Sequence, residues 1–103
     1  MTSRMAPIHP GEHLADYLED YKLTQYALAK ALHVSPRRIQ EITRGDRSIT
    51  PDTALRLGRY FGTTARFWLN LQADYDLDCA KLTLGKRLVQ EVKPRKDIPR
   101  EVA

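Results

Sequence analysis

Hydrophobic residues recur along this chain at the three- and four-residue spacing of amphipathic helices. In the segment that begins at Pro10, the apolar positions are Leu14, Tyr17, Leu18 and Tyr21. They share one face of a helix with about 3.6 residues per turn. The same spacing in later segments predicts four further helices, and alternating apolar residues do not extend over the length of a strand. The sequence therefore predicts an all-α fold of five helices.

The predicted helices begin and end at residues that favour helix termini. Ser35-Pro36 and Thr50-Pro51 each place a capping hydroxyl before a proline whose fixed φ suits the first helical position. Gly45 follows the third helix as a C-terminal stop. The five predicted segments are residues 10–21, residues 25–32 after Thr24, residues 35–44, residues 51–61 before Gly62, and residues 64–82 after a Thr63 cap.

Beyond Gly85 the helical pattern weakens. Leu88, Val89 and Val92 fit either one more helical turn or a short strand. Residues 94–103 contain two prolines, several charges and little apolar content, which is the composition of a mobile tail. We therefore expect one helical domain over residues 1–84 and a partly disordered C-terminal extension over residues 85–103.

Residues 24–45 have the layout of a helix-turn-helix, in which two short helices are joined by a turn of three or four residues. Ala29 is small, as a close crossing of two helices requires. Val34, Ile39 and Ile42 are the apolar positions expected to hold the second helix on the core. In proteins with this layout the second helix enters the major groove of DNA.

The outward face of this second helix follows from its inward residues. At about 100° per residue, the side opposite Ile39 and Ile42 carries Arg37, Gln40 and Glu41. Arginine can donate twice to guanine, glutamine can pair with adenine, and glutamate can accept from cytosine, so these three residues are the predicted base readers. Backbone N–H groups at a helix start and flanking polar side chains bind phosphates. The predicted phosphate contacts are Thr24, Gln25, Ser35, Arg38, Arg44 and Arg47.

A solvated helix face is the alternative interpretation of these charged residues. The overall charge separates the two interpretations poorly, because 17 Lys and Arg against 13 Asp and Glu give a net charge of only +4. The distribution is more informative. Arginines concentrate between residues 37 and 47, whereas Asp74, Asp76 and Asp78 form an acidic stretch. This segregation, together with the helix-turn-helix spacing, favours a DNA-reading face.

Other classes of protein find little support in the sequence. No paired carboxylates, nucleophile with a base, or glycine-rich phosphate loop indicates an enzyme, and no cofactor is expected. His9 and His13 are spaced for zinc at a helix start, but without a Cys or carboxylate cluster we expect no metal site. We interpret the single cysteine, Cys79, as a buried or interface apolar residue. The absence of a long apolar run indicates a cytoplasmic protein without a signal peptide or membrane span.

The fifth predicted helix has two apolar stripes, whereas a helix on the surface of a monomer needs one. One stripe comprises Phe67, Trp68, Leu71, Tyr75, Cys79 and Leu82. The other comprises Leu69, Ala73, Leu77, Ala80 and Leu84, and we expect it to form a twofold dimer interface. Cover by residues 88–92 of the same chain is the alternative. A dimer would suit a palindromic site, with the two reading helices one DNA turn apart.

Several stretches resemble a known family. Residues 25–29 (QYALA) and 34–42 (VSPRRIQEI) resemble the helix-turn-helix of lambda-repressor-like (XRE) proteins. The stretches HPGE at 9–12, GDRSIT at 45–50, FWLNLQ at 67–72 and YDL at 75–77 narrow the resemblance to HigA (VapI) antitoxins, over about residues 7–78. His33 departs from the glycine that members often have in the turn, and a positive φ is expected there.

This resemblance implies the fold, the partners and the function. It implies a lambda-repressor-like DNA-binding domain in a homodimer that binds a palindromic operator in its own promoter. It also implies an antitoxin of a type II toxin-antitoxin system, which neutralises a HigB toxin, a ribosome-dependent mRNA endonuclease of the RelE type. A stand-alone regulator of phage-repressor type, without a toxin, would use the same DNA-binding residues and remains the alternative.

Overall fold

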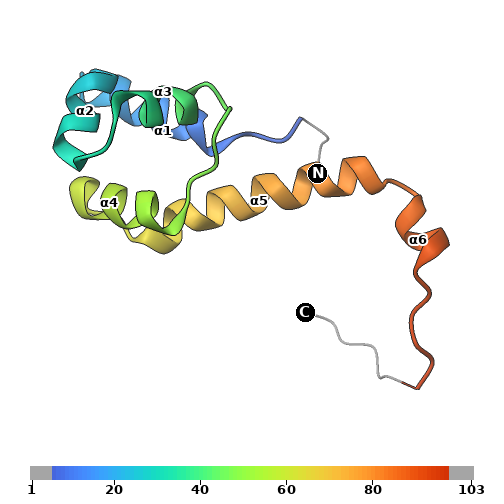
Figure 1. The fold of residues 1–103 in the computed structure, drawn as a ribbon. Helices are drawn as coiled ribbons and strands as arrows, with labels where there is room; N and C mark the ends of the chain where they lie inside the picture. The colour runs from blue at the N-terminus through green and yellow to red at the C-terminus, as the bar shows by residue number, and fades with distance from the viewer. Residues whose placement is uncertain (1–5, 98–103) are drawn as a thin grey trace.

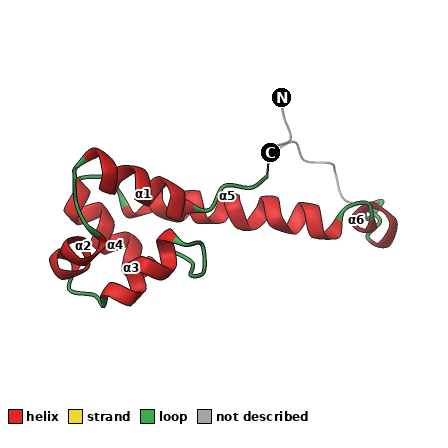
Figure 2. Cartoon of the chain, turned by 90° about the horizontal axis from the view of Figure 1, so that it is seen from above, coloured by secondary structure: helices red, strands yellow, loops and turns green. Residues whose placement is uncertain are grey.

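The computed structural model describes residues 6–97, and all its regular elements are helices (Figure 1). The helices are α1 (Pro10–Asp20), α2 (Gln25–Leu32), α3 (Pro36–Thr43), α4 (Pro51–Phe61), α5 (Ala65–Leu84) and α6 (Arg87–Glu91). Helices α1 to α4 gather around the beginning of α5, while the rest of α5 projects from this body as a rod with α6 at its far end (Figures 1 and 2). The predicted all-α fold is confirmed.

Capping residues start the helices nearly where the sequence predicts. The Ser35 hydroxyl accepts the Arg38 N–H at 3.1 Å at the start of α3. The cap of α5 is Thr64, which accepts the Phe67 N–H at 3.0 Å, so the prediction of Thr63 is wrong by one residue. The Thr63 hydroxyl instead accepts the indole N–H of Trp68 at 2.8 Å. A buried indole N–H needs a partner, and this demand explains the shift.

The core lies between α1, α2, α3, α4 and the first turns of α5. Its largest fully buried apolar side chains are Trp68, Leu14, Leu28, Ile39, Ile42 and Leu57. Each such side chain contributes about 1.5–3 kcal/mol by leaving water. The Tyr17 ring packs edge-on against Phe61 and Trp68, with centroids 4.9 and 5.2 Å apart. These contacts join α1 to α4 and α5.

Helix α1 approaches the end of α3 so closely that only glycine fits at residue 11. A Cβ atom on Gly11 would lie 1.9 Å from the carbonyl oxygen of Ile42. His9 fixes this approach, because its Nδ1 accepts the Gly11 N–H at 2.8 Å and its ring packs edge-on against Tyr75 at 4.9 Å. Burial lowers the pKa of His9. The HPGE stretch thus seats α1 against both α3 and α5.

The turn between α2 and α3 adopts the left-handed conformation expected at His33. Its φ is 60°, and the N–H groups of His33 and Val34 return to the carbonyls of Lys30 and Ala29 at 3.2 and 3.0 Å. Ala29 is fully buried, as the close helix crossing requires. A second positive φ, 52° at Lys22, was not predicted. Both turns leave a helix through a left-handed residue that is not glycine.

Helix α5 is longer than predicted and buries a different set of residues. It ends at Leu84 and is followed by the short helix α6, so one of the two alternatives for residues 88–92, a helical turn, is confirmed. On the apolar stripe that contains Trp68, Phe67 and Leu82 are exposed. Gln72 is buried although it is polar. The core therefore covers a narrower strip of α5 than the apolar pattern suggests.

The second apolar stripe of α5 is mostly open to solvent. Ala73, Leu77 and Ala80 are exposed, and Leu69 and Leu84 are half-buried. Leu88, Val89 and Val92 are themselves 49, 73 and 62 % exposed, so this segment does not cover the stripe. Of the tail predicted for residues 94–103, residues 98–103 lie outside the described residues. In the part of the chain that is described, none of the helices combines the length and apolarity needed to cross a bilayer.

Candidate nucleic-acid interface

Helix α3 turns its polar side to solvent, as the periodicity predicts. Ile39 and Ile42 are fully buried. On the opposite side, Gln40 is exposed and the Arg37 side chain is 81 % exposed. Arg44 is the C-cap of α3; its side chain is 63 % exposed and pairs with Asp46 at 3.3 Å. An arginine and a glutamine therefore stand side by side on a helix whose other face is anchored.

An open groove of about 780 Å³ runs along this outward side. It is lined by Gln25, Tyr26, Pro36, Arg37, Gln40, Glu41, Arg44 and Asp46. The groove lies between the start of α2 and the outward side of α3, which are neighbours in a helix-turn-helix. Tyr26 was missed in the sequence analysis, although an aromatic residue next to Gln25 on the outward face of α2 was a usable signal. Its side chain is 66 % exposed and carries a hydroxyl that can donate to a phosphate.

Glu41 is held between two arginines. Its Oε2 accepts from Arg37 Nε and its Oε1 from Arg47 Nε, both at 2.9 Å. The hydrogen bonds from Arg37 and then Arg47 lower the pKa of Glu41, so the carboxylate stays charged. The Arg37 side chain is 81 % exposed, and its two terminal nitrogens are donors of the kind that can pair with guanine. The cytosine contact predicted for Glu41 stays a prediction, but both of its oxygens are already engaged.

Three of the predicted phosphate-binding residues serve the local structure of the motif. The hydroxyls of Thr24 and Ser35 cap α2 and α3 by accepting the N–H groups of Ala27 and Arg38. The Gln25 amide donates to the Thr43 hydroxyl at 3.1 Å and so links the start of α2 to the end of α3. The first N–H groups of α2 have no partners within the helix, and they lie beside the groove.

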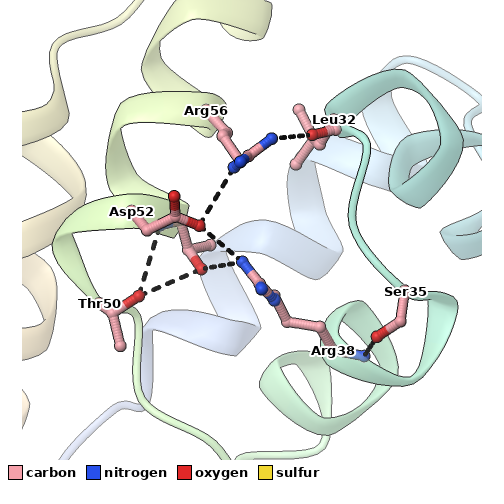
Figure 3. A network of polar contacts seen from close by, with 7 residues as sticks. Leu32, Ser35, Arg38, Thr50, Asp52 and Arg56 are labelled. Carbon is pink, nitrogen blue, oxygen red and sulfur yellow. Dashed lines mark hydrogen bonds and ion pairs between the residues drawn. The ribbon is translucent and has the colours of Figure 1, made fainter.

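Arg38 points from α3 toward the start of α4 (Figure 3). Its Nη1 donates to Asp52 Oδ2 at 2.8 Å and to the Thr53 hydroxyl at 3.4 Å. Arg56 donates through Nε to the same oxygen at 3.1 Å and through Nη1 to the Leu32 carbonyl at 2.7 Å. The phosphate contact predicted for Arg38 stays a prediction, but its side chain is only 29 % exposed and is held against α4, whereas those of Arg37 and Arg44 are 81 and 63 % exposed.

A side chain of α5 holds the loop between α3 and α4 in place. The side-chain oxygen of buried Gln72 accepts the Ile49 N–H at 2.7 Å, and its amide donates to Asp76 at 3.0 Å. This loop carries Arg47 into contact with Glu41 at the edge of the groove. Gln72 is a supporting residue that sequence reasoning missed, since a pattern of apolar residues gives no signal for a buried polar side chain.

The remaining candidates for chemistry do not form a site. Within residues 6–97, no three His, Cys, Asp or Glu side chains gather in a way that could hold a metal ion. Cys79 is half-buried, and a hydrogen bond between it and Tyr75 raises the pKa of the tyrosine. The surface around α3 is therefore the most developed candidate site in the described part of the chain.

Comparisons with known proteins agree with this geometry. The helix-turn-helix family model matches residues 14–68. Virulence-associated protein I of Dichelobacter nodosus is 59 % identical over 80 residues, which cover 77 % of this chain and 74 % of that protein. A HigA-family addiction module antidote protein from Coxiella burnetii superposes with a TM-score of 0.86 at 50 % identity, covering 88 % of this chain and all of the other.

A third relative was solved together with DNA. The Pseudomonas aeruginosa antitoxin HigA with the higBA promoter has a TM-score of 0.82 and 46 % identity, and the match covers 85 % of this chain and 97 % of that one. Proteins of this family are not enzymes, in agreement with the sequence analysis. The resemblance inferred from the motifs is confirmed, and the chain belongs to the HigA (VapI) family of lambda-repressor-like helix-turn-helix antitoxins.

Proposed function

We propose that this protein is an antitoxin that binds a specific operator DNA through α3. The observation that carries the proposal is the outward pair of Arg37 and Gln40, on a helix fixed by fully buried Ile39 and Ile42. Arginine and glutamine are the side chains that recognise guanine and adenine most directly in the major groove. The P. aeruginosa relative, whose structure includes promoter DNA, supports the same use of the fold.

The surrounding residues divide into phosphate contacts and supports. Gln25, Tyr26 and Arg44 line the groove beside the base readers, and Arg47 contacts Glu41 at its edge; these exposed side chains can bind phosphates on either side of the DNA major groove. Thr24 and Ser35 contribute through the helix starts that they cap. Glu41 orients Arg37 and Arg47 by its two ionic hydrogen bonds. In this proposal residues 1–84 form the DNA-binding domain and residues 85–103 an extension to it.

We further propose that the protein acts as a homodimer through the exposed stripe of α5. Leu77 is 55 % exposed and lies between exposed Ala73 and Ala80 on a helix that projects from the body. Burying this stripe against its symmetry mate would remove apolar surface from water. It would also give the two α3 helices a twofold relation, which a palindromic operator with half-sites about 34–36 Å apart requires.

The relatives of this protein suggest its protein partner and the gene that it regulates. We propose that the protein represses its own operon and neutralises a HigB-type mRNA endonuclease encoded beside it. The HigA name of its relatives and the promoter DNA in one of their structures support this proposal. Co-purification of the protein with the product of a short neighbouring gene supports an antitoxin. Without such a product, the stand-alone regulator would be the correct alternative.

DNA binding is tested directly with the segment upstream of the protein's own gene. Fluorescence anisotropy with this duplex and with a shuffled duplex of equal length gives the ratio of specific to non-specific affinity. We expect a ratio of at least about 10³ at physiological salt. Equal affinities for the two duplexes would overturn sequence-specific binding at this operator. Footprinting of the bound duplex should then protect two half-sites one helical turn apart.

A further inference from the structure

The network around Asp52 joins the three helices whose arrangement determines how α3 meets DNA. One carboxylate oxygen, Asp52 Oδ2, accepts from Arg38 of α3 and from Arg56 of α4 (Figure 3). Arg56 continues to the last carbonyl of α2, at Leu32. The end of α2, the start of α3 and the start of α4 are thus connected at a single acceptor.

Asp52 is itself held in place. It lies in the first turn of α4, where the helix dipole favours a negative charge. Thr50 caps this turn, and its hydroxyl is 3.4 Å from that of Thr53, which Arg38 also reaches. The hydrogen bonds from Arg38 and Arg56 lower the pKa of Asp52. The carboxylate is therefore a fixed charged acceptor.

The same contacts determine which partners the Arg38 guanidinium binds. Its side chain is 29 % exposed, against 81 % for its neighbour Arg37, although both belong to the first turn of α3. An arginine freed at this place would lie at the edge of the candidate interface and could bind a phosphate of any sequence. In the structure, Asp52 thus holds the Arg38 guanidinium against α4 and away from this edge.

From this arrangement we propose that Asp52 is a positioning residue for DNA reading, which orients α3 relative to α2 through Arg38 and Arg56 and keeps Arg38 away from phosphates. The inference rests on the proposed operator binding. It predicts that Asp52 raises the discrimination between operator and other DNA. A residue that only stabilised the fold would affect both kinds of DNA alike.

The test compares Asp52→Asn with the parent for operator and shuffled DNA over a range of salt concentrations. We expect operator affinity to fall about three- to tenfold, as loss of an ionic network allows. We expect shuffled DNA to bind more tightly, with a log–log salt slope steeper by about 0.9, the value for one added phosphate contact. In the Asp52→Asn/Arg38→Gln double variant, the salt slope for shuffled DNA should return to that of the parent. Asp78→Asn removes a negative charge at an exposed position of α5 and controls for the change in net charge.

Each other outcome overturns the proposal. Unchanged affinities would show that the network does not influence DNA reading. Equal gains on both duplexes would mean that Asp52 only repels DNA, and equal losses with an unchanged salt slope would mean that it only stabilises the fold. Circular dichroism and thermal melting verify that the variants are folded, and Asp52→Glu provides a variant that retains the charge. If the parent itself fails to prefer its operator, the proposed function fails, and that result is separate from any effect of Asp52.

Discussion

Replacing Gly11 with alanine tests whether α1 seats the end of the reading helix. The new Cβ would lie 1.9 Å from the Ile42 carbonyl oxygen and 2.8 Å from its carbon, whereas ordinary contact begins near 3.4 Å. These atoms are backbone, so no side chain can rotate away, and α1 or the end of α3 must move by more than an ångström. Overpacking typically costs about 1–3 kcal/mol, and a clash this close with backbone atoms places Gly11→Ala at the upper end, about 3 kcal/mol.

The net effect can be worked out from two opposing terms. Alanine in place of glycine within a helix gains about 1 kcal/mol of propensity. The expected net loss is therefore about 2 kcal/mol, and the melting temperature of a domain of this size should fall by roughly 8 °C or more. Because the end of α3 is displaced, operator affinity should also fall at temperatures where the variant is still folded.

Thermal and urea unfolding, followed by circular dichroism at the helix band, measures the stability. Gly62→Ala is the matched control, because a Cβ there meets nothing within 4 Å and only the positive φ of 77° is strained. That variant should lose about 1 kcal/mol and retain the operator affinity of the parent. A Gly11→Ala protein as stable as the parent, with unchanged operator binding, would refute the role assigned to this close approach.

Two further predictions concern pH and assembly. Burial lowers the pKa of His9, so this histidine takes up a proton at a higher pH in the unfolded chain than in the folded protein. The free energy of unfolding should therefore decrease as the pH falls below about 6.5 toward the lower pKa of His9 in the folded protein. His9→Asn keeps a capping acceptor without this charge, so its melting temperature should fall less than that of the parent between about pH 7.5 and 5.5; equal losses would contradict the assignment. Leu77→Asp should lower the solution mass measured by light scattering from dimer to monomer and weaken operator binding, whereas Thr83→Asp, at an exposed polar position of the same helix, should leave both unchanged. A dimeric Leu77→Asp protein would place the interface elsewhere.

Local signals in the sequence were sufficient for most of the fold. Capping hydroxyls, prolines and glycines act on the residues next to them, so the starts of α3 and α4 and the turn at His33 could be predicted. The direction of Ile39 and Ile42 followed from periodicity, and it determined which side of α3 carries Arg37 and Gln40. These inferences depend on contacts within one or two turns of helix.

Contacts between distant segments could not be predicted in this way. Arg38 lies on the flank of α3, and only the position of Asp52 on α4 decides that its guanidinium turns inward. Gln72 is buried because the Ile49 N–H, 23 positions away, needs an acceptor. The apolar stripes of α5 gave no way to tell that Phe67 and Leu82 would stay exposed. Each of these outcomes depends on the packing of whole helices.

The claim that α3 reads bases is tested most directly by measuring the affinity of the parent and of Arg37→Ala for operators in which each base pair is replaced in turn. We predict that the parent loses about 1–3 kcal/mol at one guanine-containing pair per half-site, and that Arg37→Ala becomes indifferent to this pair while its other preferences persist. Arg66→Ala, which removes an exposed arginine from α5, should keep the profile of the parent. An Arg37→Ala protein with the complete base preferences of the parent would contradict the assignment of α3 as the reading helix.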